Sequence, residues 1–123
     1  MQVEELRECL RNSELRDSFY EELGSRFRID DSQTLDVMRY FMDDVISNER
    51  ENEWCMLKTL YARTKVRTSL NDFHYNVIPM LVRMGFLELK MFMAPTGEYM
   101  RVVRLCMSFV IDQLCPIMAA LKE

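Results

Sequence analysis

The chain has 123 residues, 49% of them hydrophobic, with only three glycines, three prolines and a formal net charge of −4. This length suits one domain with a sizeable core, and the composition excludes a disordered tail or linker. No apolar run reaches the roughly 20 residues of a membrane span, so no membrane partner is expected. The charged start, MQVEELRECLRNSELRD, also predicts no secretory signal peptide.

Apolar residues recur at helical spacing in four stretches of the first half of the chain. The predicted helices lie within residues 3–10, 15–23, 30–50 and 53–63, and the apolar arc of the third runs from Leu35 to Ile46. Gly24 is expected to end the second helix, because glycine readily adopts the left-handed conformation of a helix end. The polar run SNEREN separates the third helix from the fourth.

The second half predicts a capped helix, a β-hairpin and a last helix. Ser69 and Asp72 have the spacing of a capping box, and Gly85 is expected to end the helix that they begin. FLELKMFM and EYMRVVRL predict two strands, and APTG between them supplies turn residues. The closing stretch CMSFVIDQLCPIMAALKE predicts an apolar helix that Pro116 interrupts or kinks.

This order of helix, helix, turn, helix and β-hairpin, over residues 33–105, resembles the winged-helix superfamily. LVRMGFLELK is similar to that superfamily's passage from the third helix into the wing. The resemblance implies a mainly α fold: a winged-helix core of three helices and a hairpin, in a single domain 1–123. Residues 1–32 would add N-terminal helices and residues 106–123 a C-terminal helix. It also implies two classes of use, DNA binding and protein assembly, between which fold alone does not choose.

The third helix of that core divides into two faces at 100° per residue. The predicted core face holds Leu70, Phe73, Val77, Met80, Leu81 and Met84. The predicted outward face carries an apolar cluster, which more often marks a protein contact than a DNA contact: Tyr75, Ile78, Pro79 and Val82. Two alternatives remain. The N-terminal helices could cover Ile78 and Val82, or Pro79 could end the helix early.

Charge is divided unevenly along the chain. Residues 1–53 hold seven Arg and fifteen Asp or Glu, a net charge of −8, whereas residues 57–105 carry a net charge of +5. The two halves could complement each other, or the basic half could bind a polyanion. The candidate nucleic-acid contacts are Arg63, Lys65, Arg67, Arg101 and Arg104 on phosphate and Asn71 and Asn76 on bases. A solvated surface is the other explanation for these cations, and any binding is expected to be weak and nonspecific.

The last helix predicts a further contact with protein. Its apolar stripe holds Met107, Val110, Ile111, Leu114, Ile117, Met118 and Leu121. Phe109 falls away from this stripe, so we expect it to contact another chain, in a homodimer or a heteromeric complex. The eleven methionines suit adaptable partner surfaces as well as ordinary core.

The residues give little support for catalysis or for metal binding. His74 is the only histidine, and no particular cysteine or serine is placed beside it as a nucleophile would require. Cys9, Cys55, Cys106 and Cys115 form no CxxC pair, so we expect no metal site and four reduced thiols. Neither cofactor nor small-molecule substrate is indicated.

The sequence therefore predicts a non-enzymatic, intracellular interaction or assembly subunit, cytoplasmic or nuclear. It would bind protein through the apolar face of the third helix and through the terminal helices. The alternative is a DNA-binding winged-helix transcriptional regulator or chromatin-associated factor.

Overall fold

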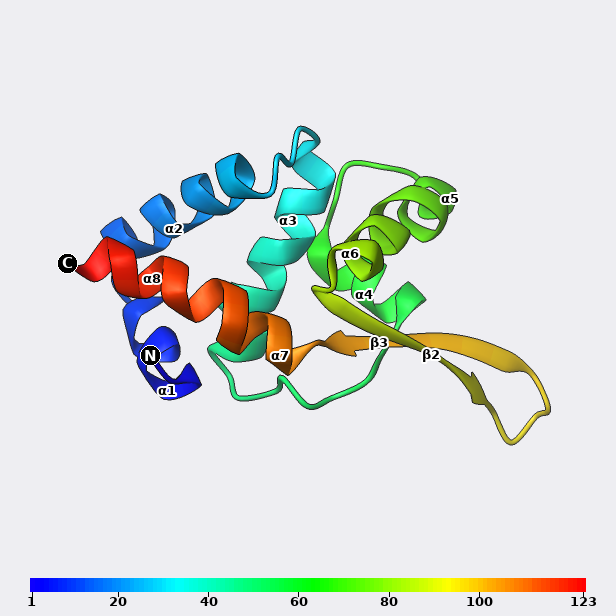
Figure 1. Cartoon of the computed structure of the whole chain (residues 1–123). Helices are drawn as coiled ribbons and strands as arrows, with labels where there is room; N and C mark the ends of the chain where they lie inside the picture. The colour runs from blue at the N-terminus through cyan, green and yellow to red at the C-terminus, as the bar shows by residue number, and fades with distance from the viewer.

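The computed structural model describes residues 1–123 and confirms a mainly helical chain with one small antiparallel sheet (Figure 1). Its elements in chain order are α1 (Val3–Cys9), α2 (Ser13–Arg26), α3 (Ser32–Tyr40), η1 (Phe41–Ile46), β1 (Cys55–Met56), α4 (Leu57–Thr64), α5 (Leu70–Asp72), η2 (Phe73–Val77), α6 (Ile78–Met84), β2 (Leu87–Met93), β3 (Tyr99–Leu105), α7 (Met107–Phe109), η3 (Val110–Leu114) and α8 (Cys115–Lys122). The η segments are wide, π-helical stretches, so α3–η1, α5–η2–α6 and α7–η3–α8 are each one continuous helix.

Local signals set several of the helix ends. The Ser69 hydroxyl accepts a hydrogen bond from the Asp72 N–H at 3.0 Å, which confirms the predicted start of the α5–η2–α6 helix. Gly85 ends that helix with a φ of +88°, as expected. The prediction for Gly24 is wrong, because α2 continues to Arg26.

The sheet has the order β1–β3–β2, with all neighbours antiparallel. β2 pairs with β3 from Leu87↔Leu105 to Met93↔Tyr99, and the short strand β1 pairs only with Val102 and Val103. A helix was expected from residue 53, whereas α4 begins only at Leu57. The difference arises because pairing with β3, far along the chain, overrides the local helical pattern.

The terminal helices pack together at one end of the molecule. In Figure 1 both chain ends lie on the same side, and the β2–β3 hairpin projects from the opposite side. The last helix α8 packs against α1 and α2, whereas α6 packs against α3 and β2. The N-terminal helices therefore cover the last helix and do not cover the third helix of the predicted core.

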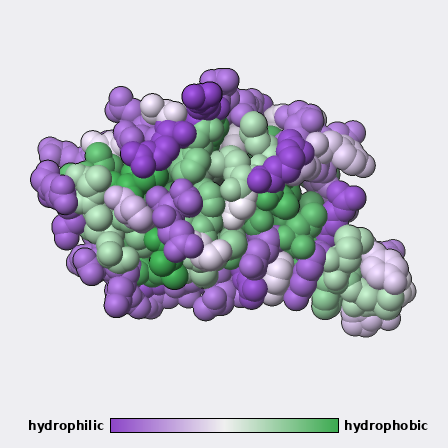
Figure 2. Space-filling view, in the orientation of Figure 1, coloured by the Kyte–Doolittle hydropathy of each residue, from purple (hydrophilic) through white to green (hydrophobic).

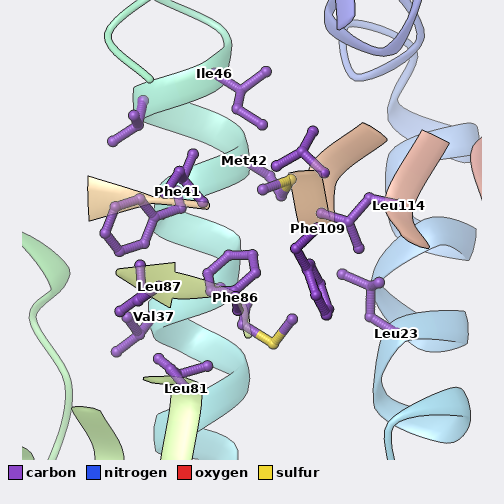
Figure 3. Packing of buried hydrophobic residues seen from close by; sticks show 14 of the residues in the cluster. Leu23, Val37, Phe41, Met42, Ile46, Leu81, Phe86, Leu87, Phe109 and Leu114 are labelled. Atoms are coloured by element: carbon purple, nitrogen blue, oxygen red, sulfur yellow. The ribbon is translucent and has the colours of Figure 1, made fainter. Parts of the chain in front are cut away.

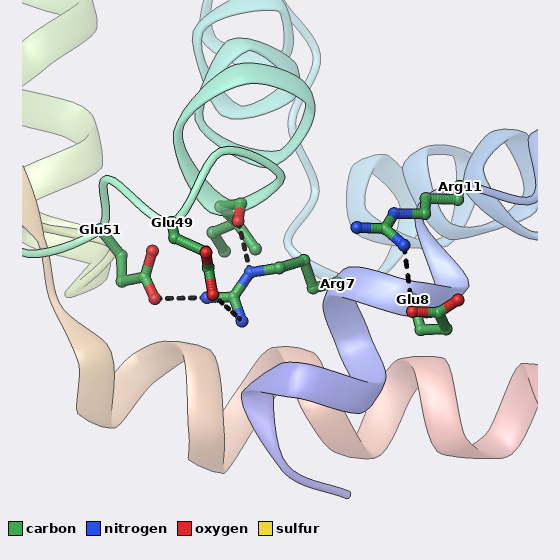
Figure 4. Close-up of polar contacts among 6 residues, drawn as sticks. Arg7, Glu8, Arg11, Glu49 and Glu51 are labelled. Atoms are coloured by element: carbon green, nitrogen blue, oxygen red, sulfur yellow. Dashed lines mark hydrogen bonds and ion pairs between the residues drawn. The ribbon is translucent and has the colours of Figure 1, made fainter.

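A buried arginine joins α1 to the segment that follows η1 (Figure 4). The Arg7 Nε donates to the Ile46 carbonyl at 2.7 Å, and its Nη2 donates to the Glu51 carboxylate at 2.5 Å. Arg7 is buried, and the Glu51 side chain is only 13% exposed. The more exposed Glu49 lies 3.7 Å from Nη1. The guanidinium thus caps a helix end and neutralises a nearly buried carboxylate at once.

The centre of the core is aromatic (Figure 3). Phe86 lies between Phe41 and Phe109, with ring centroids 5.8 Å from each and edge-to-face geometry. Phe27 is a second aromatic neighbour of Phe109, with its ring centroid 5.4 Å away. Phe109 is only 9% exposed, so the prediction that it faces another chain is wrong, and the homodimer loses its predicted contact.

The wide stretches explain why a regular helical period predicts the wrong exposure for several side chains. In a π-helical stretch each N–H bonds five residues back, so side chains five apart share a face. Phe109 and Leu114 are five residues apart in the last helix, as are Phe73 and Ile78 in the third helix of the core, and all four are buried. Met80 and Ile111, both predicted to be core, are instead turned outward and exposed.

Both prolines that lie within helices come shortly after a wide stretch. Pro79 lies two residues after Val77, the end of η2, and Pro116 lies two residues after Leu114, the end of η3. A proline ring clashes with the carbonyl four residues back in a regular α-helix, and a wider turn makes room for it. The helices accordingly run through both prolines, and neither the early end at Pro79 nor the interruption at Pro116 is observed.

Candidate functional site

The β2–β3 hairpin exposes most of the large apolar side chains that the core leaves out. We call five of them the apolar hairpin patch: Leu89, Met91, Phe92, Met93 and Tyr99. In Figure 2 the projecting hairpin forms a separate lobe, in which pale green apolar residues lie beside pale purple ones. Large exposed apolar groups gathered on one element mark an interaction surface more often than scattered ones do.

The register of the hairpin divides these side chains between two sides, because directly paired residues of an antiparallel sheet share a face. Leu89, Met91 and Met93 lie on one side together with Tyr99 and Arg101. The other side carries Phe92 and also a stacked cluster around Trp54. There the Lys90 ammonium lies 4.1 Å and the Arg104 guanidinium 4.3 Å from the centre of the Trp54 ring.

A groove separates the hairpin from the third helix, and we call it the helix–hairpin groove. It consists of two adjoining hollows of about 190 and 400 Å³, which share Leu57, His74 and Arg101 as lining residues. The smaller hollow is lined further by Ile78, Pro79, Val82, Arg83 and Leu89. The larger is lined further by Met56, Lys58, Tyr75, Glu98, Tyr99 and Met100.

The four side chains predicted on the outward face of the third helix all line this groove. Tyr75 is exposed, and Pro79 and Val82 are partly buried. Ile78 is only 2% exposed, so its predicted exposure is wrong. The wide stretch η2 turns it toward the core, where it forms the floor of the groove, and a partner would reach its neighbours first.

His74 places a polar atom in this apolar setting. Its Nε2 is buried and has no hydrogen-bond partner within the chain. Burial, and then the positive charges of Arg101 and Lys58, lower the His74 pKa below its ordinary value. The imidazole is therefore neutral at neutral pH, and the groove lining includes no serine or cysteine to act as a nucleophile with it.

The charges of the two halves do not meet within the chain. Every ion pair joins residues of the same half, so the basic residues 57–105 are not neutralised by the acidic residues 1–53. Lys58, Arg83 and Arg101 at the groove are exposed and form no ion pair. Glu98 is the only acidic residue in the lining.

The candidate nucleic-acid contacts are divided by the structure. Arg63, Lys65, Arg67 and Asn71 are exposed, as is Arg101. Arg104 instead pairs with Glu88, with its Nη2 2.9 Å from the carboxylate. The Asn76 amide donates to the Asp72 carboxylate at 2.6 Å. Hydrogen bonds from Thr68 and Asn76 lower the Asp72 pKa, so an anion persists beside the residues that would read bases.

Sequence reasoning missed the apolar hairpin patch, although the chain carried a signal for it. A strand with one buried face alternates apolar and polar residues, whereas Met91, Phe92 and Met93 are apolar in succession. Such a run beside a turn, far from the body of the fold, leaves at least one apolar face in water.

Comparison with protein families, curated proteins and solved structures finds no match to this chain. Among its helices none combines the length and the apolar character needed to cross a membrane.

Proposed function

We propose that this chain is a winged-helix protein that acts as a non-enzymatic interaction or assembly subunit. The order of three helices followed by a β-hairpin supports the winged-helix assignment, with α3–η1, α4 and α5–η2–α6 as the three helices. The β2–β3 hairpin is then the wing. In this proposal the wing and the adjoining face of the third helix bind a protein partner.

The apolar hairpin patch is the observation that carries the proposal. Burying a Phe or Met side chain is worth about 1.5–3 kcal/mol, so leaving several in water is costly unless a partner covers them. β2 is also an edge strand with a free row of backbone groups, because β3 lies between it and β1. An apolar edge on a projecting hairpin suits contact with another protein.

Phe92→Asp should remove recovery of the partner and leave the protein folded. Phe92 is 48% exposed, and substitutions at exposed positions usually change stability by about 0.5 kcal/mol or less. The test is co-purification from native cells with quantitative mass spectrometry, with and without nuclease. We expect protein partners that survive nuclease and that Phe92→Asp loses.

Ile111→Asp is the matched control. Ile111 is 49% exposed and lies on the last helix, away from the hairpin, so this variant should recover the same partners as the parent. Partners that disappear with nuclease would contradict the proposal, as would partners that Phe92→Asp retains in full.

DNA binding is the second candidate, and the exposed cations Arg63, Lys65, Arg67 and Arg101 favour it. We expect only weak, sequence-independent binding, because the Asp72 anion lies beside the residues that would read bases and because the affinity of phosphate contacts falls steeply with salt. Lys65→Glu combined with Arg101→Glu should abolish it in a fluorescence-anisotropy titration with a duplex. A submicromolar, sequence-selective complex near physiological salt would reverse the ranking of the two functions.

A further inference from the structure

We infer that the helix–hairpin groove binds a short segment of a partner protein in which a large apolar side chain is flanked by carboxylates. This inference rests on the proposed role as an interaction subunit and specifies the chemistry of the partner. Three features of the groove carry it: its apolar smaller hollow, its unpaired cations and the buried nitrogen of His74.

The smaller hollow suits a side chain. Its lining is mainly apolar, with Leu57, Ile78, Pro79, Val82 and Leu89. Its volume is about 190 Å³, and it adjoins the larger hollow of about 400 Å³. An apolar side chain inserted from a partner would displace water from these walls, as the anchor residues of protein interfaces do.

The cations that line the groove favour a partner with negatively charged side chains. Lys58, Arg83 and Arg101 are exposed and without ion pairs, and only Glu98 opposes them. In the acidic half, by contrast, Arg7, Arg11, Arg26, Arg39 and Arg50 are all paired with carboxylates. Carboxylates on the partner would complete the same kind of pair at the groove, and charge complementarity of this kind also speeds association.

His74 brings into the groove a buried polar atom that needs a hydrogen-bond partner. Its Nε2 is buried between the third helix and the hairpin without a hydrogen-bond partner, and such atoms are normally satisfied. A backbone or side-chain group of a bound peptide supplies that partner. A nucleic-acid backbone matches the cations, but it brings no apolar group for the smaller hollow.

A second copy of this chain does not fit the groove. None of its nine exposed large apolar side chains has an acidic residue on both sides in the sequence: Leu89, Tyr99 and Ile111 each have one acidic neighbour, and the other six have none. A segment in which carboxylates flank an apolar anchor therefore comes from a different protein.

The test is selection of a phage-displayed library of random dodecapeptides on the immobilised full chain. We expect enrichment of peptides that combine Leu, Ile, Phe or Trp with Asp or Glu. The enriched peptides, synthesised with a fluorophore, should bind at least tenfold more weakly to Leu89→Asp and to Arg101→Glu. Both residues are exposed and line the groove, so both variants should remain folded by circular dichroism. His74→Leu should also weaken binding, because it removes the buried nitrogen that the peptide would satisfy.

Two control variants separate the groove from general surface effects. Ile111→Asp introduces the same charge on another exposed apolar residue, and Arg67→Glu reverses an exposed cation outside the groove lining. Both should bind the peptides as the parent does. Peptides that bind the four surface variants equally would overturn the inference, as would enrichment of basic or uncharged sequences or no enrichment at all.

The remaining outcomes distinguish other occupants and the proposed function. Light scattering that shows a dimer in the parent and a monomer in Leu89→Asp assigns the groove to a second copy and overturns the inference. Displacement of the peptides by duplex DNA at low micromolar concentration assigns the groove to nucleic acid and also overturns the inference. If Phe92→Asp abolishes partner recovery while no groove-dependent peptide is found, the interaction role stands and the groove inference fails.

Discussion

Ile78→Asp should unfold the protein or bring it close to unfolding. The side chain is 2% exposed and belongs to the main core cluster. A buried, unpaired carboxylate typically costs about 3–5 kcal/mol, against a total stability of roughly 5–15 kcal/mol for a domain. Urea denaturation followed by circular dichroism should show a large fall in the midpoint, or no folded baseline.

Ile111→Asp provides the matched comparison, because it makes the same change on the last helix at a residue that is 49% exposed. Its midpoint should lie near that of the parent, within about 0.5 kcal/mol. A regular helical period predicts the reverse, with Ile111 inside and Ile78 outside. The pair therefore tests the wide stretches η2 and η3 directly, and a stable Ile78→Asp beside an unfolded Ile111→Asp would contradict them.

Arg7→Leu should lower the free energy of unfolding by about 3–5 kcal/mol, although it replaces a charged residue with an apolar one. The loss leaves the Glu51 carboxylate nearly buried and without its partner, and removal of one member of such a pair is far costlier than removal of both. The Ile46 carbonyl also loses the hydrogen bond from the Arg7 Nε. Chemical denaturation gives the measurement.

The double variant Arg7→Leu with Glu51→Leu should recover much of that loss, because no unpaired charge then remains in the buried position. Arg11→Leu is the control. Arg11 pairs with Glu8 at 3.3 Å, but both side chains are well exposed, and such surface pairs contribute about 0–1 kcal/mol. If Arg7→Leu proved as mild as Arg11→Leu, the bridge between α1 and the segment after η1 would contribute little to stability.

The uneven distribution of charge leaves unpaired cations on the surface of the basic half. Most arginines of the acidic half form ion pairs with carboxylates of that half, and no ion pair joins the acidic half to the basic half. Free cations therefore remain in the turn before the third helix and at the groove, where exposed apolar groups also form part of the lining. Both a protein partner and DNA can bind to cations, but only a protein partner would also cover the apolar groups. For this reason the sequence alone leaves protein binding and DNA binding as alternatives.

The sequence by itself determined the features that depend on neighbouring residues. The cap at Ser69, the helix end at Gly85 and the turn with Gly97 at a φ of +87° all agree with it. A cap or a turn is decided by hydrogen bonds and backbone angles within about four residues, so its signal is local. The order of helices and strands follows from the same local patterns.

Only the tertiary structure decided which faces are buried. Pairing with β3 made a strand of Cys55–Met56, and the wide stretches turned Ile78 and Phe109 inward and Met80 outward. A regular period assumes that each helix keeps one phase, and a single wide turn shifts every side chain after it. The exposure of the hairpin had the same origin. Whether Met91, Phe92 and Met93 meet another element depends on how far the hairpin projects, and that distance is set by packing between residues far apart in the chain.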